Sequence, residues 1–186
     1  MKTTTKFEKD LTESCALAVE FLRKKDEKYN KLNKREGKDR LYSSEAQFVA
    51  EVYHLLVEMD KSYRMHLFIN YLNPEKGEKV ERKIPDLVYR NGQNAKSIVE
   101  VKVPVDEDLF MSANESLNKK ITEFKLISKD YKKLKEHYLD FSTKFLVIAY
   151  LGDIKLDDGS EFPLVKFIES VRKEFKSTGK IRVIVC

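Results

Sequence analysis

Apolar residues recur every three or four positions in three stretches of the chain, which is the spacing of a helix that buries one face. The spacing predicts helices over residues 6 to about 29, about 45–59 and about 114–138, and a further helix is expected over 162 to about 176. The apolar stripes that we expect to be buried are Phe7, Leu11, Cys15, Ala18 and Leu22; Phe48, Val49, Val52, Leu55, Leu56 and Met59; and Leu117, Ile121, Phe124, Ile127, Tyr131, Leu134 and Tyr138.

Runs rich in β-branched and aromatic residues predict five strands, at 65–72, 80–89, 96–103, 144–151 and 180–186. The run 144–151 is apolar on both faces, as expected of a central strand. Pro85 has no N–H to donate, so the second strand should be irregular or unpaired there. The order of these elements predicts a single α/β domain over 1–186, with a mixed central sheet flanked by helices.

The second and third predicted strands form a hairpin that brings like charges together. A five-residue loop over 91–95, centred on Gln93, places Asp86 opposite Glu100. Side chains alternate along a strand, so Glu100 and Lys102 share a face, and Asp86 joins them from the neighbouring strand. The apolar residues expected on that face are Ile84, Val88 and Ile98. Directly opposed like charges destabilise a sheet, so a cation, such as a divalent metal ion, is expected between the two acids.

A third acid is expected to point inward from a helix. Ser43 and Ser44 precede the helix 45–59 and can cap its N-terminus. Glu45, in the first turn, falls on the same face as the apolar stripe of that helix. One interpretation is a favourable interaction of Glu45 with the helix dipole. The other is that Glu45 belongs to the same site as Asp86 and Glu100.

These residue types suit a magnesium or manganese site. Hard divalent cations prefer carboxylate, carbonyl and water oxygens, and Asp86, Glu100 and the backbone carbonyl of Val101 can provide such ligands. Glu45 could hold a second ion or a water molecule. Lys102, on the same face, could orient water or stabilise negative charge that develops on a phosphate. The residues present therefore favour hydrolysis of phosphodiesters, although an exposed ion pair between Glu100 and Lys102 is the alternative.

The sequence Pro85-Asp86, thirteen intervening residues, then Glu100-Val101-Lys102 resembles the motif of the PD-(D/E)XK nucleases, the restriction-endonuclease-like superfamily. The resemblance implies an αβββαβ core, here over 43–151, with an N-terminal helical and basic extension over 1–42 and a C-terminal helix-strand extension over 152–186. It implies that Glu45, Asp86 and Glu100 belong to the metal site and that Lys102 is the catalytic lysine.

The function implied by the resemblance is a Mg²⁺- or Mn²⁺-dependent nuclease that acts on nucleic acid, with DNA the expected substrate and a homodimer a possible state. The alternative is a non-catalytic nucleic-acid-binding or assembly module on the same fold. An enzyme with a non-nucleic substrate is a third reading. The sequence does not distinguish single strands, duplexes, junctions or RNA as the substrate.

The composition excludes few of these functions. The 186 residues carry a formal net charge of +5, and 36% are charged. The basic stretch 23–40 and the lysine-rich segment 119–135 could contact phosphates or simply face water. The three histidines are scattered, which weakens a His-based nuclease or a zinc hydrolase, and the two cysteines have no metal-binding spacing. Neither a signal peptide nor an apolar run of membrane-spanning length is evident, so an intracellular protein is expected.

Overall fold

The structure, a computed structural model, describes residues 5–33, 44–69, 85–91, 94–103, 122–136, 141–151, 169, 172–173, 175 and 180–186. The helices within these residues are α1 (Lys6–Asn33), α2 (Glu45–Met59), α3 (Tyr63–His66) and α5 (Thr122–Glu136). The strands are β1 (Leu67–Ile69), β2 (Leu87–Asn91), β3 (Asn94–Lys102), β4 (Thr143–Ile148) and β5 (Ile181–Val185), and they form one sheet in the order β1-β2-β3-β4-β5.

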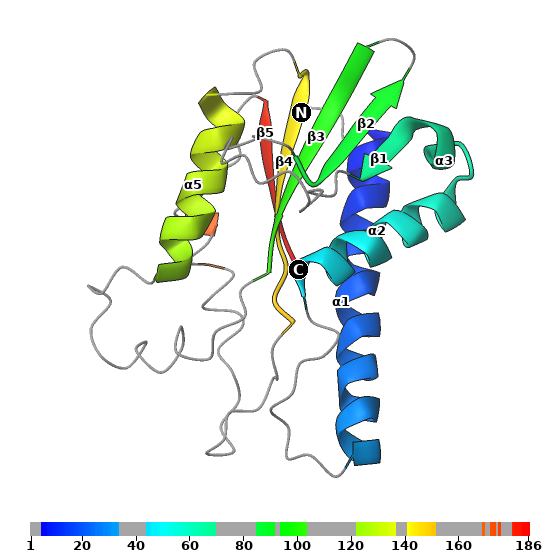
Figure 1. Cartoon of the computed structure of the whole chain (residues 1–186). Helices are drawn as coiled ribbons and strands as arrows, with labels where there is room; N and C mark the ends of the chain where they lie inside the picture. The colour runs from blue at the N-terminus through cyan, green and yellow to red at the C-terminus, as the bar shows by residue number, and fades with distance from the viewer. Residues whose placement is uncertain are drawn as a thin grey trace, which may run out of the picture.

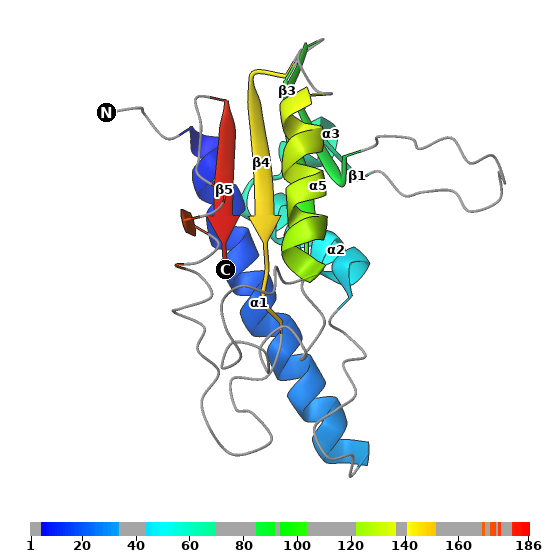
Figure 2. The ribbon, with the colours of Figure 1, turned by 90° about the vertical axis from the view of Figure 1, so that its left-hand side faces the viewer.

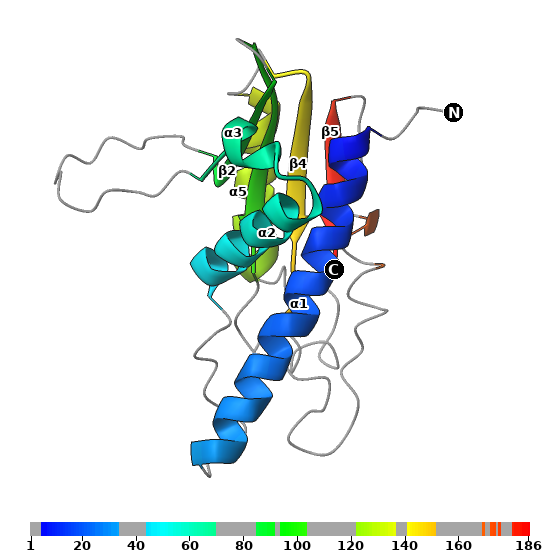
Figure 3. The same ribbon diagram turned by 90° about the vertical axis from the view of Figure 1, so that its right-hand side faces the viewer.

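The sheet is mixed, and helices cover both of its faces. β1, β2 and β3 are antiparallel neighbours, whereas β3, β4 and β5 run parallel to one another. α5 lies on one face, in front of the sheet in Figure 2, and α1 and α2 lie on the other, in front of it in Figure 3 (Figure 1 shows both sides). The predicted α/β class with a mixed, helix-flanked sheet is therefore confirmed.

The core between the sheet and α1 and α2 follows the predicted helical spacing. All five predicted positions of α1 are buried, and so are Phe48, Val49, Val52 and Leu56 of α2. They pack against the side chains of β3 and β4 that point to this face, among them Val99 and Phe145. The prediction for Met59 is wrong, since it is 37% exposed at the end of α2.

The second core lies between the sheet and α5. Ile127 and Leu134 of α5 are fully buried against Val88, Ile98 and the neighbouring side chains of β4. These two residues belong to the predicted stripe of the helix 114–138. The predicted stripe also includes Leu117, Ile121, Phe124 and Tyr138, whose side chains lie outside the described residues. α5 is thus observed over Thr122–Glu136.

A bulge sets the register of the β2–β3 hairpin. The predicted five-residue loop is wrong, because pairing continues to Asn91↔Asn94. The register then shifts next to Tyr89, which pairs with Ser97, so that Lys96 is the extra residue on β3. Beyond the shift, Leu87 pairs with Val99, and one further step places Asp86 opposite Glu100, as predicted.

Two other element boundaries differ from the prediction. Met65 and His66 belong to the short helix α3 and not to the first strand, because the Ser62 N–H donates to Asp60 Oδ1 at 2.9 Å and the resulting turn leads into one helical turn. α1 reaches Asn33 rather than residue 29, since the charged residues at its end are good helix formers. The predicted helix 162–176 falls almost entirely outside the described residues.

The irregularity expected at Pro85 is present. β2 begins only at Leu87, so Pro85 and Asp86 precede the paired part of the strand. Pro85 is nevertheless buried, which fixes the direction from which the chain enters the sheet. Among the described residues, no helix is both long enough and apolar enough to cross a membrane.

Replacing Phe145 with alanine should destabilise the fold strongly. Phe145 has no exposed surface and makes an edge-to-face contact with Phe7, with ring centroids 5.7 Å apart. We expect the free energy of unfolding to fall by about 3–5 kcal/mol in urea titrations followed by circular dichroism. Phe21→Ala is the matched control, because Phe21 is 42% exposed on α1 and its removal should cost less than about 1 kcal/mol. Equal effects of the two changes would contradict the described core.

Candidate functional site

The charged cluster lies where β3 ends. Glu100 and Lys102 are on the β3 face that also carries Ile98 and that α5 covers. α2 lies on the opposite face, but its first turn comes close to the end of β3 (Figure 1). Two layers of helices therefore meet the sheet at the carboxyl end of a central strand, which is where ligands commonly bind in α/β folds.

Asp86 is held against the backbone of β3. Its Oδ2 accepts a hydrogen bond of 2.6 Å from the Val101 N–H. The N–H and C=O of one residue leave a strand on the same side, so the Val101 carbonyl also points toward the edge of β3 where Asp86 lies. This arrangement brings together two of the predicted oxygen donors.

Glu100 is the most buried acid of the cluster. Its side chain is only 5% exposed, and its Oε1 lies 2.7 Å from Lys133 Nζ of α5. Burial raises the pKa of Glu100 to about 7, the hydrogen bond from Lys133 opposes that rise, and the negative charge of Asp86 adds to it. A carboxylate in this position is thus stabilised by a nearby positive charge, such as that of Lys133.

Lys102 lies between two acids from different helices. Its Nζ is 3.0 Å from Glu45 Oε2 of α2 and 3.4 Å from Asp130 Oδ2 of α5. Burial lowers the pKa of Lys102, but the charges of Glu45 and Asp130 outweigh this effect and hold the pKa above its ordinary value. Lys102 is accordingly an ammonium group at neutral pH and a donor, not a base.

The acids of the cluster act on one another as well. Burial raises the pKa of Asp86 to about 6; the hydrogen bond from Val101 opposes the rise, and the charge of Glu45 adds to it. When all side chains are ionised, Glu45, Asp86, Glu100 and Asp130 carry four negative charges against the two positive charges of Lys102 and Lys133. In that fully ionised state the cluster has an excess of two negative charges.

The four side chains predicted from the sequence lie together, and α5 adds two that the sequence reasoning missed. Asp130 is not among the predicted site residues, and Lys133 is predicted only as part of the lysine-rich segment 119–135. A signal was present for Asp130, since it lies three residues after Ile127 and four before Leu134, on the flank of the buried stripe. Lys133 lies one turn further along that flank.

No three His, Cys, Asp or Glu side chains of the described residues are grouped closely enough to hold a metal ion as they stand. Ammonium groups occupy positions between the acids: Lys133 is next to Glu100, and Lys102 is between Glu45 and Asp130. The sites predicted for a cation are thus neutralised in part by the chain's own lysines.

The metal-free protein should lose stability as the pH rises from about 5 to about 8. Asp86 and Glu100 bind protons more tightly in the folded than in the unfolded chain, because their folded pKa values are about 6 and about 7 rather than 3.8 and 4.5. Their stabilising effect is complete below the unfolded values and disappears as the pH rises through the folded ones. One pKa unit is worth about 1.4 kcal/mol, so the loss from Glu100 is on the order of 3 kcal/mol.

Urea midpoints measured across this pH range in EDTA would show the loss. Glu100→Gln should flatten the pH dependence, because the amide has no proton to release. Glu58→Gln should leave it unchanged, since Glu58 is exposed on α2. A wild-type protein that becomes more stable than Glu100→Gln as the pH rises would contradict the assigned burial of Glu100.

Comparisons of the chain with known proteins find no relative. No protein-family model matches the chain, and neither a curated protein nor a solved structure matches it. The chemistry of the site is therefore argued from its own residues.

Proposed function

We propose that the protein is a Mg²⁺- or Mn²⁺-dependent nuclease of the PD-(D/E)XK type, which hydrolyses phosphodiester bonds of nucleic acid, with DNA as the substrate. The observation that carries the proposal is the meeting of Asp86, Glu100, Lys102 and Glu45 at the carboxyl end of β3. Residues far apart in the sequence meet in the arrangement that the motif leads one to expect.

The order of the elements supports the same proposal. Among the described residues, the order from α2 to β4 is a helix, three strands, a helix and a strand, with the short helix α3 before the first strand. This is the order of the restriction-endonuclease-like core. Asp86 lies just before the second of the three strands and Glu100 on the third, and Glu45 begins the first helix. α1 and β5 then extend that core at its two ends.

The donor atoms of the site fit a hard divalent cation. Asp86, Glu100 and the Val101 carbonyl would hold the ion, with Glu45 nearby, and all of these donors are oxygens, as Mg²⁺ and Mn²⁺ prefer. The excess of two negative charges equals the charge of one such ion. When bound, the ion would polarise a phosphoryl oxygen and assist the ionisation of water. The buried acids, which are costly to ionise in the metal-free chain, would then be neutralised.

Lys102 supplies positive charge to the reacting phosphate. Glu45 and Asp130 contact its ammonium group from two sides, so that the side chain is fixed in direction before substrate arrives. A preorganised ammonium group stabilises negative charge that develops in the transition state without the cost of reorientation. Since its pKa is raised, Lys102 is not the proton acceptor of the reaction.

Cleavage of labelled single-stranded and duplex DNA in the presence of Mg²⁺ or Mn²⁺ tests the proposal. Asp86→Asn, Glu100→Gln and Lys102→Met should each lower the rate by at least about a hundredfold, because each removes charge next to the reacting phosphate. Lys9→Met is the control, since Lys9 is exposed on α1, on the face of the sheet opposite to α5.

Cleavage should stop when EDTA is added. If EDTA leaves the rate unchanged, or if Asp86→Asn cleaves as fast as wild type, the observed activity does not arise from this site. Binding of Mn²⁺ measured by calorimetry gives an independent result, because it should disappear in Glu100→Gln whether or not the right DNA substrate has been chosen.

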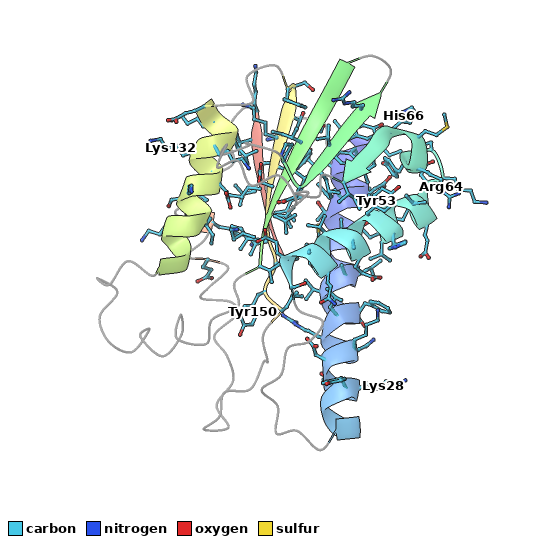
Figure 4. All side chains as sticks on the ribbon, viewed as in Figure 1. Lys28, Tyr53, Arg64, His66, Lys132 and Tyr150 are labelled. Atoms are coloured by element: carbon cyan, nitrogen blue, oxygen red, sulfur yellow. The ribbon has the colours of Figure 1, made fainter. Side chains whose placement is uncertain are left out.

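A non-catalytic nucleic-acid-binding module is the second candidate, and the surface of α5 favours it. Lys129, Lys132 and Lys135 are exposed on this helix, and Figure 4 shows Lys132 on the side that faces away from the sheet. Such a row of lysines can follow a phosphate backbone whether or not the neighbouring site cleaves it.

The salt dependence of DNA binding tests that surface. If the three exposed lysines of α5 each contact a phosphate, the logarithm of the binding constant should fall against the logarithm of salt concentration with a slope of about −3 for duplex DNA. Replacing all three by glutamine should flatten the slope. Binding without cleavage in Mn²⁺, combined with no Mn²⁺ uptake, would favour the module over the enzyme.

A further inference from the structure

The pair between Lys133 and Glu100 joins α5 to the centre of the site. The ammonium group lies 2.7 Å from Glu100 Oε1, and the Glu100 side chain is only 5% exposed. A buried carboxylate needs a cation or a proton, and Lys133 provides the cation. Glu100 is also the acid that the proposed metal ion requires. Lys133 and the ion therefore compete for one carboxylate.

The two lysines of the site are held differently. Lys102 lies between Glu45 and Asp130, on β3, and neither acid is a principal donor to the proposed ion. Lys133 pairs with Glu100 itself. An ion that binds Glu100 would therefore leave the contacts of Lys102 in place, whereas it would repel the ammonium group of Lys133 and compete with it for the carboxylate oxygens.

The Lys133 side chain can move toward solvent when the ion binds. Its side chain is 20% exposed, on a four-carbon stem that can turn from the buried acid toward solvent. Two of the exposed lysines of α5, Lys129 and Lys132, lie four positions and one position before it on the outward side of the helix. A phosphate that approached the site along this helix would meet Lys133 next.

We propose that Lys133 serves as a stand-in cation for Glu100 in the metal-free protein and moves to a phosphate of the nucleic acid when a divalent ion takes its place. This role rests on the proposed function, because it needs both the metal ion and the phosphate. It makes Lys133 a positioning residue that links the two binding events. In the metal-free protein the ammonium group offsets the charge of Glu100, and its release adds positive charge for substrate only when the ion is present.

Calorimetric titration with Mn²⁺ of wild type, Lys133→Met and Lys132→Met tests the first half of this proposal. Methionine keeps most of the length of the side chain but removes the charge. We expect Lys133→Met to bind Mn²⁺ at least about tenfold more tightly than wild type, because the ion no longer displaces an ammonium group. Lys132→Met, the neighbouring change on the exposed side, should bind like wild type. Lys133→Arg should restore the competition.

Fluorescence polarisation with a labelled DNA duplex tests the second half. Ca²⁺, which also prefers oxygen ligands, replaces Mg²⁺ here to separate binding from cleavage. The proposal requires Lys133→Met to weaken DNA binding more in Ca²⁺ than in EDTA, since the wild-type lysine reaches the phosphate only after release. If Lys133 were purely structural, Lys133→Met would instead lower the stability of the metal-free protein. The ratio of the DNA affinities in Ca²⁺ and in EDTA would then be the same as in wild type.

The outcomes separate this proposal from the proposed function. Mn²⁺ binding by wild type that is lost in Glu100→Gln, with the same or weaker affinity in Lys133→Met, would overturn the role of Lys133 and leave the metal site intact. An absence of Mn²⁺ binding in both wild type and Lys133→Met would overturn the metal site and this proposal together. Mn²⁺ binding in Lys133→Met alone would support the competition directly.

Discussion

The burial of one carboxylate, that of Glu100, is the constraint on which the site depends. In water a glutamate is ionised and stable at neutral pH, but on the covered face of β3 it is 5% exposed and its pKa rises to about 7. Water cannot stabilise the charge there, so the surrounding groups must. Lys133 does so in the metal-free chain, and the remaining contacts of the cluster are arranged around this pair.

The hairpin register brings the second acid to the same place. At the tip of the hairpin Arg90 pairs with Ala95, and this register, if continued, would put Asp86 opposite Val99, on the other face. The bulge at Lys96 shifts the pairing by one residue and returns Asp86 to the face of Glu100. One additional residue in β3 thus decides whether the two acids meet or lie on opposite sides of the sheet.

Much of this arrangement could be predicted from the sequence because it follows from periodicity. The buried faces of α1 and α2 and the register that brings Asp86 next to Glu100 depend on residues close together in the chain. Glu45 was expected to point inward, but its side chain is 39% exposed while it contacts Lys102. The register of the hairpin near Asp86 was predicted correctly partly because two differences cancel. The loop was predicted too long, and the bulge shifts the pairing of β2 and β3 by the one residue that this error would otherwise have cost. The helical turn at Met65 depends on a hydrogen bond from the Ser62 N–H to the Asp60 side chain, which no hydrophobic pattern reveals.

The partners of the charged residues of α5 were hard to predict for a different reason. Hydrophobic spacing shows which face of a helix is buried, but it does not show which charges of the sheet lie under the flank of that face. Ile127 and Leu134 fix the helix on Ile98, and the same docking sets Asp130 beside Lys102 and Lys133 beside Glu100. The position of α5 on the sheet is therefore determined by apolar packing and by charge pairing together. A change that shifted α5 on the sheet would move Asp130 away from Lys102 and Lys133 away from Glu100, so the apolar core on this face determines which charges of the site are paired.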